Sequence, residues 1–173
     1  LAGLLALGAW GSLVSLLGRI GRRRQVGGEI IAVDTTLPDV TGVSCRLDAG
    51  WPGHRPGQFA FVRFADGEPP HPFTLAGADR GNREIHFQIK ALGDYTGGLG
   101  KRLAAGQPVT VEGPYGRFDL ARRNPAARQI WVAGGIGVTP FLAWLEALQD
   151  QPEQAPAAEL HYCTRDRLAD PFV

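Results

Sequence analysis

The sequence predicts a β-rich sandwich or barrel followed by the first part of a parallel α/β unit. From residue 29 to residue 116, short apolar segments alternate with turn sequences such as WPGHRPG and DRGN. After a polar stretch, the pattern becomes strand, helix, strand between residues 129 and 164. The chain has 24 glycines and 13 prolines in 173 residues, which suits many turns.

The expected elements share β-branched and aromatic residues or a helical repeat of apolar ones. QFAFVRF is apolar on both faces apart from Gln58 and Arg63, so we expect a central strand that is covered on both sides. One helix, roughly Thr96 to Leu103, interrupts the β pattern, and DLARRNPAAR (119–128) resembles a polar linker. The predicted barrel strands are Glu29–Thr35, Gly42–Leu47, Gln58–Phe64, Pro72–Ala78, Glu84–Lys90 and Pro108–Glu112, and the α/β elements are Gln129–Ala133, Pro140–Gln149 and Glu159–Thr164.

Composition excludes several classes of function. The formal net charge is +1, which does not indicate a nucleic-acid partner. Cys45 and Cys163 lie far apart, so neither a zinc site, an iron–sulfur cluster nor a disulfide scaffold is expected. His54, His86 and His161 are scattered along the chain, and we expect ordinary surface or core residues rather than metal ligands.

The N-terminal segment, residues 1–24, indicates a membrane. Residues 1–17 carry no charge, and Arg19, Arg22, Arg23 and Arg24 follow them. We expect the end of a transmembrane helix whose arginines mark the cytoplasmic side. A buried or interfacial helix at a domain edge is the alternative. The chain has no Met, so we expect it to be a piece of a longer protein.

The stretch IWVAGGIGVTPFLAWLEAL predicts a phosphate site between a strand and a helix. Thr139 is placed to cap the helix and Pro140 suits its first position. Glycines let the backbone approach a phosphate at the positive end of the helix. A lone glycine turn is weak evidence for a phosphate site, but its position between a strand and a helix strengthens the prediction. The cradle residues are Gly134, Gly135, Gly137, Thr139 and Pro140.

The end of the second parallel strand bears on which nucleotide is bound. LHYCTRDR places Arg165 and Arg167 there, with Asp166 between them. Arginine at this position can accept the 2′-phosphate of NADPH, whereas an acidic residue binds the ribose of NADH. We expect NADPH, with Arg165 as its ligand. The alternative is that these are solvated loop charges, which suits Arg167 better.

Five motifs follow one another along the chain: PGQFAFV (56–62), HPFTLAG (71–77), KALGDYTGGL (90–99), VEGPYGRF (111–118) and AGGIGVTP (133–140). In this order they resemble the ferredoxin–NADP reductase superfamily, from about residue 28 to the end. The match looks closest to its membrane branch, the ferric reductases and NADPH oxidases.

The resemblance implies a six-stranded antiparallel FAD-binding barrel (25–118), a linker (119–128) and a partial NADPH-binding domain (129–173). Phe73 would stack on or border the flavin ring, and Thr74 would place its hydroxyl near the atom that accepts hydride. Lys90 would assist the flavin or be an exposed strand-end residue. The resemblance implies FAD ligands at His71, Pro72, Phe73, Thr74, Lys90, Gly93 and Thr96.

The implied activity is an NAD(P)H-dependent oxidoreductase, with electrons passing from NADPH through FAD to a one-electron acceptor. We expect that acceptor to be haem in upstream membrane helices of the same chain or a partner, with the FAD and NADPH domains in the cytoplasm. Alternatives are a soluble-type flavoreductase serving an oxygenase, and a non-catalytic flavin-binding regulatory module. Because the α/β part is short, we expect FAD to bind better than NADPH.

Overall fold

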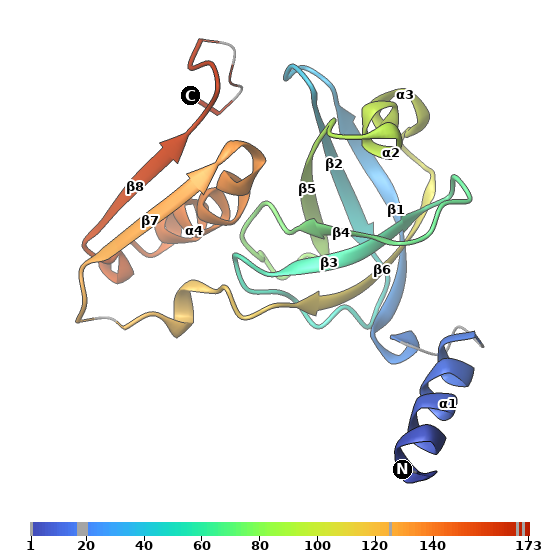
Figure 1. Cartoon of the computed structure of the whole chain (residues 1–173). Coiled ribbons are helices and arrows are strands. Elements are labelled where there is room, and N and C mark those ends of the chain that lie inside the picture. The colour runs from blue at the N-terminus through green and yellow to red at the C-terminus, as the bar shows by residue number, and fades with distance from the viewer. Residues whose placement is uncertain (1, 17–20, 125, 169, 171) are drawn as a thin grey trace.

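The computed structural model describes all residues except 1, 17–20, 125, 169 and 171 (Figure 1). Six antiparallel strands form one sheet in the order β4-β3-β6-β1-β2-β5. Its two edge strands approach one another through a bridge between Leu75 and Phe87, so the sheet nearly closes into the predicted barrel. The strands are β1 (Gln25–Asp34), β2 (Val40–Leu47), β3 (Phe59–Phe64), β4 (His71–Thr74), β5 (Glu84–Lys90) and β6 (Pro108–Tyr115).

Strict alternation along β5 explains how the barrel forms its core. Ile85, Phe87 and Ile89 are buried, whereas the side chains between them face outward. Period-2 burial of this kind gives each strand one apolar face for the core and one for other contacts. The outward row His86, Gln88 and Lys90 is therefore available to the second half of the molecule.

Strand β3 corrects one expectation from the sequence. It lies inside the sheet, between β4 and β6, but it is fully covered on only one face. Ala60, Val62 and Phe64 are buried in the core. On the other face Arg63 is exposed, and Phe59 and Phe61 are only partly covered, with their rings near Tyr115. The run is apolar on both faces because aromatic side chains cluster outside the barrel as well.

The helix expected from Thr96 to Leu103 is instead two short helices, α2 (Asp94–Gly97) and α3 (Leu99–Arg102). Gly97 ends α2 and Gly98 separates it from α3, since glycine is unfavourable inside a helix. Strand β4 likewise ends at Thr74 rather than Ala78, because beyond it the amide of Ala76 donates to the carbonyl of His86 on β5.

The α/β half contains two parallel strands, β7 (Gln129–Gly134) and β8 (Ala158–Cys163), with helix α4 (Thr139–Asp150) between them in sequence. Trp131 and Ala133 of β7 pack against Phe141 and Trp144 of α4. The opposite face of β7 is open, with Ile130 68% and Val132 65% exposed. The helix therefore covers one face of this small sheet.

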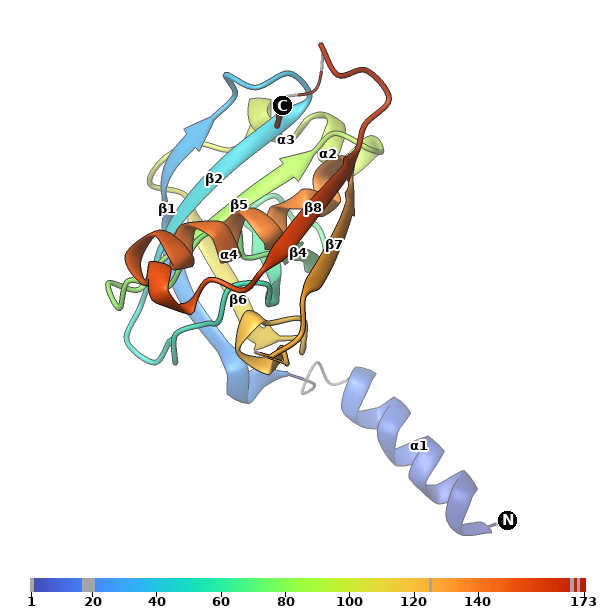
Figure 2. The same ribbon diagram turned by 90° about the vertical axis from the view of Figure 1, so that its left-hand side faces the viewer.

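Helix α4 also joins the two halves (Figures 1 and 2). The indole N–H of Trp144 donates to the carbonyl of Pro56 at 2.8 Å, and its ring stacks on Phe118. Gly57 has a φ of +95°, and a Cβ there would lie 2.0 Å from the Phe118 carbonyl oxygen. Glu146 of α4 pairs with Arg80 of a barrel loop. These contacts position the second half against the barrel.

The segment predicted as a polar linker is anchored rather than loose. Residues Leu120–Arg122 form a short 3-10 turn. Asp119 is buried, and its carboxylate accepts a hydrogen bond from Arg122 and lies 3.5 Å from an Arg55 nitrogen. The two arginines offset the free-energy cost of burying the Asp119 carboxylate. The first residue of a segment whose sequence resembles a solvated linker is therefore buried.

Helix α1 (Ala2–Leu16) extends outside the barrel in both views (Figures 1 and 2). Its described side chains are exposed although they are apolar, including Leu4, Leu5, Leu7 and Trp10. Among the described residues, no helix has both the length and the apolar character needed to span a membrane. The expected transmembrane helix end stays a prediction.

Candidate functional site

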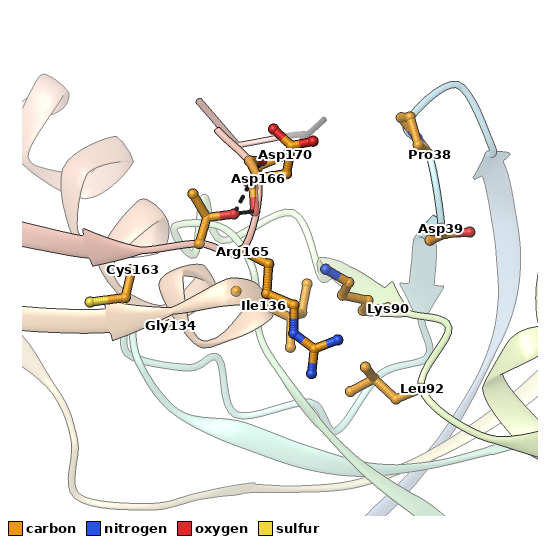
Figure 3. Close-up of a pocket in the computed structure, with 12 residues that line it drawn as sticks. Pro38, Asp39, Lys90, Leu92, Gly134, Ile136, Cys163, Arg165, Asp166 and Asp170 are labelled. Atoms are coloured by element: carbon orange, nitrogen blue, oxygen red, sulfur yellow. Dashed lines mark hydrogen bonds between the residues drawn. The ribbon is translucent and has the colours of Figure 1, made fainter. Parts of the chain in front are cut away.

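Two cavities meet between the halves of the molecule. The larger, of about 640 Å³, lies between the C-terminal ends of β7 and β8 and the barrel (Figure 3). The smaller, of about 230 Å³, lies against β4 and β5. Lys90, Leu92 and Ile136 line both cavities, so the cavities share a wall. Two ligands bound there would lie on either side of these three residues, and close placement of two reacting groups is what direct transfer needs.

The smaller cavity contains most of the predicted flavin residues. Pro72, Phe73, Thr74, Lys90 and Thr96 line it. The Phe73 ring also packs on the core residues Phe64 and Phe87, at centroid distances of 6.4 and 6.2 Å. Phe73 thus borders the cavity with the part of its surface that the core leaves uncovered.

The three hydroxyl groups that line the smaller cavity differ in whether they already form a hydrogen bond within the protein. Thr96 Oγ1 accepts hydrogen bonds from the amides of Leu92 and Gly93. Thr139 donates to the carbonyl of Ile136 at 2.7 Å. Thr74 makes no side-chain hydrogen bond to the described part of the chain, so its hydroxyl is available to a ligand.

Glycines at the two predicted phosphate turns leave space that no described residue fills. A Cβ at Gly93 or Gly137 would have no heavy atom within 4 Å. Neither residue has a left-handed φ, so neither packing nor backbone conformation requires glycine there. Glycine at these two turns is compatible with close approach of a ligand to the backbone. Gly135 is different, because its φ of +50° itself favours glycine.

The start of α4 corrects the predicted capping scheme. A 3-10 turn (Gly135–Val138) runs directly into the helix, which begins at Thr139, with Pro140 in its second position. Thr139 is 1% exposed, and its hydroxyl donates to Ile136 instead of accepting an amide as a cap would. The prediction that Thr139 caps the helix is wrong, because the turn before it is already helical. Gly134 and Gly135 line the larger cavity as expected.

His71 lies beside α2 and outside the lining of both cavities. Its ring stacks on Tyr95 with centroids 3.9 Å apart, and its Nε2 is buried without a hydrogen-bond partner among the described residues. Arg102 lies over the same tyrosine ring at 5.3 Å and donates to the Tyr95 carbonyl at 2.7 Å. Burial, followed by the nearby charge of Asp66, raises the pKa of Tyr95 to about 12.

Arg165 follows β8 and points across the larger cavity towards Lys90 and Leu92 (Figure 3). Asp170 also lines this cavity, from the segment that follows β8. Its carboxylate accepts hydrogen bonds from Thr164 at 2.6 Å and Tyr162 at 2.8 Å. The hydrogen bond from Thr164 is the main reason that the pKa of Asp170 is lowered. Two basic side chains, Lys90 and Arg165, therefore line the cavity from opposite halves, together with the carboxylates of Asp39, Asp166 and Asp170.

Several residues in or near the cavities were missed in the sequence. Leu92 and Ile136 are apolar residues inside quoted motifs, and nothing distinguished them from core residues. Tyr95 lies in the quoted stretch GDYT, where its neighbours carried the interpretation. Gln88 shares the outward face of β5 with Lys90, and this period-2 relation could have identified it.

A barrel joined to a parallel α/β unit, with adjoining cavities between them, defines the ferredoxin–NADP reductase class of flavin- and nicotinamide-dependent electron-transfer proteins. The sequence agrees, since residues 27–119 match the model of a family described as FAD-binding domain. The chain belongs to this FAD-binding domain family.

Several curated relatives are named as components of oxygenase systems. The chain is 30% identical over 109 residues to the anthranilate 1,2-dioxygenase electron transfer component of Acinetobacter baylyi, covering 62% of this chain and 31% of the relative. It is 28% identical over 139 residues to the reductase component of propane 2-monooxygenase from Mycolicibacterium goodii, covering 78% and 39%. The chain thus spans about a third of the length of these relatives. The relatives support the superfamily but not the expected membrane branch.

Solved structures show the same fold. Phthalate dioxygenase reductase superposes with a TM-score of 0.71 at 22% identity, covering 86% of this chain and 46% of that one. A flavohemoglobin from Malassezia yamatoensis superposes with a TM-score of 0.68 at 24% identity, covering 86% and 40%. At such identities the likeness concerns fold alone.

The residues at the site fit FAD. The backbone at Gly93 is open to a ligand, and Thr74 offers an unoccupied hydroxyl. Gln88 Oε1 is buried with no partner in the described part of the chain. Buried polar atoms are normally paired, and a bound ligand would offer the Gln88 amide a partner.

Proposed function

We propose that this chain forms the flavin- and nicotinamide-binding part of an NAD(P)H-dependent reductase that delivers electrons to a partner oxygenase or ferredoxin component. The shared wall of the two cavities, Lys90, Leu92 and Ile136, is the observation that carries the proposal. The curated relatives support this partner class, since their names describe electron-transfer and reductase components of oxygenases. In this proposal residues 25–118 hold FAD and residues 129–173 contribute the nicotinamide site.

The protein's own part in such a reaction is binding and positioning. Bound FAD supplies the capacity to take an electron pair from a nicotinamide and pass electrons on singly. Thr74 would direct its hydroxyl to the flavin from the smaller cavity. Leu92 and Ile136 give the shared wall an apolar surface. Lys90 places a positive charge beside both ligands, which favours the more electron-rich state of the site.

Phosphate groups would be held by backbone at two places. The turn at Gly135 and Gly137 presents amides at the N-terminal end of α4, where the helix dipole favours an anion. Arg165 faces the same cavity and would pair with a 2′-phosphate, so we propose NADPH as the preferred nucleotide. His71 and the Gly93–Thr96 turn would serve the FAD phosphates, as the family resemblance implies.

The test uses the full-length protein reconstituted with FAD. We expect a yellow protein that NADPH bleaches in the absence of oxygen, and that NADH bleaches more slowly. Thr74→Ala should slow bleaching about tenfold by removing a positioned hydroxyl, without loss of FAD. A protein that stays colourless, or is yellow and indifferent to both nucleotides, would instead indicate the regulatory module.

Helix α1 favours a second candidate, a reductase at a membrane. Leu4, Leu5 and Leu7 are 67–74% exposed, and three consecutive arginines, Arg22–Arg24, follow along the chain. An apolar helix beside cationic side chains suits a bilayer with anionic lipids. In this candidate the acceptor is haem on membrane helices of the same chain or a partner, and the flavin part faces the cytoplasm.

Fractionation of the full-length protein separates the candidates. A membrane reductase stays with the membranes until detergent is added, and its haem absorbance changes on addition of NADPH. A reductase for an oxygenase remains in the supernatant and reduces its partner without detergent.

A further inference from the structure

Gln88 has a side-chain amide that the protein itself leaves unused. It lies on β5, on the outward face shared with His86 and Lys90, and lines the smaller cavity. Its Oε1 is buried and has no hydrogen-bond partner in the described part of the chain. A buried amide oxygen without a partner costs free energy, so such a group calls for an explanation.

The neighbours of Gln88 offer no partner. Its cross-strand partner on β2 is Gly42, which has no side chain, and a Cβ there would lie 3.6 Å from Gln88 Nε2. The nearby carboxylate of Asp34 accepts a hydrogen bond from the Thr36 amide. His86, two residues earlier, is bonded to Ser44 at 2.9 Å. The glycine leaves the space that the glutamine side chain occupies.

Other polar side chains in the cavity are already committed. Thr96 and Thr139 use their hydroxyls within the protein. Three polar groups of the lining residues make no hydrogen bond to the described part of the chain: the Thr74 hydroxyl, the Lys90 ammonium and the Gln88 amide. Of these, only the amide offers a donor and an acceptor side by side.

We propose that Gln88 is a flavin-binding residue that hydrogen-bonds the imide edge of the isoalloxazine ring. This inference rests on the proposed FAD site and adds a residue to it. The imide edge presents an N–H donor between two carbonyl acceptors, so one primary amide can both donate to it and accept from it.

The amide should also affect the flavin's redox balance. Reduction adds electron density to the ring carbonyls, so a donated N–H stabilises the reduced form more than the oxidised form. A glutamate at this position cannot donate when ionised and repels the added charge. Gln88→Glu should therefore weaken binding of reduced FAD about tenfold more than binding of oxidised FAD. That ratio corresponds to a midpoint potential lower by about 30 mV.

The test compares Gln88→Leu, Gln88→Glu and a control, Gln25→Leu, in the full-length protein. Gln25 is an exposed strand glutamine outside the smaller cavity. The readouts are the FAD dissociation constant, from recovery of flavin fluorescence, and the midpoint potential. We expect Gln88→Leu to raise the dissociation constant three- to tenfold, the value of one or two hydrogen bonds. The control should leave both quantities unchanged.

Stability of the apoprotein provides a readout that is independent of the cofactor. Because the amide has no protein partner, Gln88→Leu should leave the apoprotein as stable as the wild type or slightly more stable. A variant that loses apoprotein stability and FAD affinity together would show that Gln88 is structural, and this inference would fail.

Failure of the inference differs from failure of the proposed function. If the wild type binds FAD tightly and both Gln88 variants match it in affinity and potential, Gln88 does not contact the ring, and the reductase proposal stands. If the wild type binds no FAD, the proposed function falls, and this inference falls with it.

Discussion

The barrel and the β7–β8 half use similar apolar residues but bury them to different extents. Phe87, Ile85 and Val62 in the barrel are fully buried, whereas every residue of β8 is exposed apart from the half-buried Tyr162. In β7 only the face under α4 is buried. The barrel is thus a self-sufficient core, while the nicotinamide half depends on one helix for its packing. We expect stability and FAD affinity to reside mainly in the barrel.

The largest expected difference between the two halves is in how much a truncated apolar side chain lowers the free energy of unfolding. Phe87→Ala empties a fully buried site and should lower the free energy of unfolding by about 3–5 kcal/mol, with loss of bound FAD. Ile130→Ser, at a residue 68% exposed, should change it by less than about 0.5 kcal/mol. Denaturant titration of both variants measures the difference. Equal losses would show that the open face of β7 is buried in the working protein.

A second pair separates the two phosphate turns. Gly93→Val should weaken FAD binding about tenfold or more and leave nicotinamide binding to FAD-saturated protein unchanged. Gly137→Val should do the opposite, because each glycine leaves open space for a different ligand. Fluorescence titration with each nucleotide provides the measurement. If either substitution affects both ligands equally, the sites are not separate.

A third test concerns the contact between the halves. Trp144→Phe keeps an aromatic ring against Phe118 but removes the hydrogen bond to Pro56. We expect a loss of about 0.5–1.5 kcal/mol in unfolding free energy and slower flavin reduction by NADPH. Trp131→Phe is the matched control, since its indole donates within β7, to Gln129. If Trp131→Phe slows flavin reduction as much as Trp144→Phe does, the hydrogen bond between the halves has no specific role in the reaction.

The smallest expected effect is a pH dependence at His54. This residue is buried beside the interface, and its ring is bonded to the Gly77 carbonyl at 3.0 Å. Burial lowers its pKa from 6.5, against the opposing influence of the Gly77 carbonyl, Asp79 and Glu146; His86 adds to the lowering. The unfolded chain therefore binds this proton more readily than the folded one. Stability is fully present above pH 6.5 and decreases as the pH falls towards the lowered value.

His54→Gln should flatten that decrease in stability, as measured by denaturant titration between pH 7 and pH 5. Substitution of the exposed His161 by Gln serves as the control and should keep the wild-type slope. A wild-type protein whose stability does not change over this range would contradict the role given to His54.

Most of the fold could be predicted because alternation and turn residues are local signals. The strand Glu84–Lys90 was placed to the residue, and the switch to a parallel unit at Gln129 is visible in the sequence. What could not be predicted depends on distant contacts. Asp119 looked like a linker residue because the arginine that approaches it from the barrel, Arg55, lies far away in sequence.

The candidate site was predictable where glycine or a motif marks it, and not where a common residue lines it. Gly93 and Gly137 could be recognised in the sequence because glycine lets a ligand approach the backbone closely. Leu92 and Ile136 are visible only once the halves are brought together. The sequence likewise does not show which hydrogen bond a side chain forms. Nothing local shows that Thr139 donates to the preceding turn rather than capping the helix.

Gly57 has a consequence for protein engineering. Any side chain there would collide with the Phe118 carbonyl and the Trp144 indole, so these three positions are sterically interlocked across the two halves. A chimaera that takes its flavin half from one reductase and its nicotinamide half from another should therefore keep glycine at position 57 wherever the second half brings tryptophan to position 144. A flavin half with a larger residue at position 57 should yield a chain whose halves fold but dock poorly.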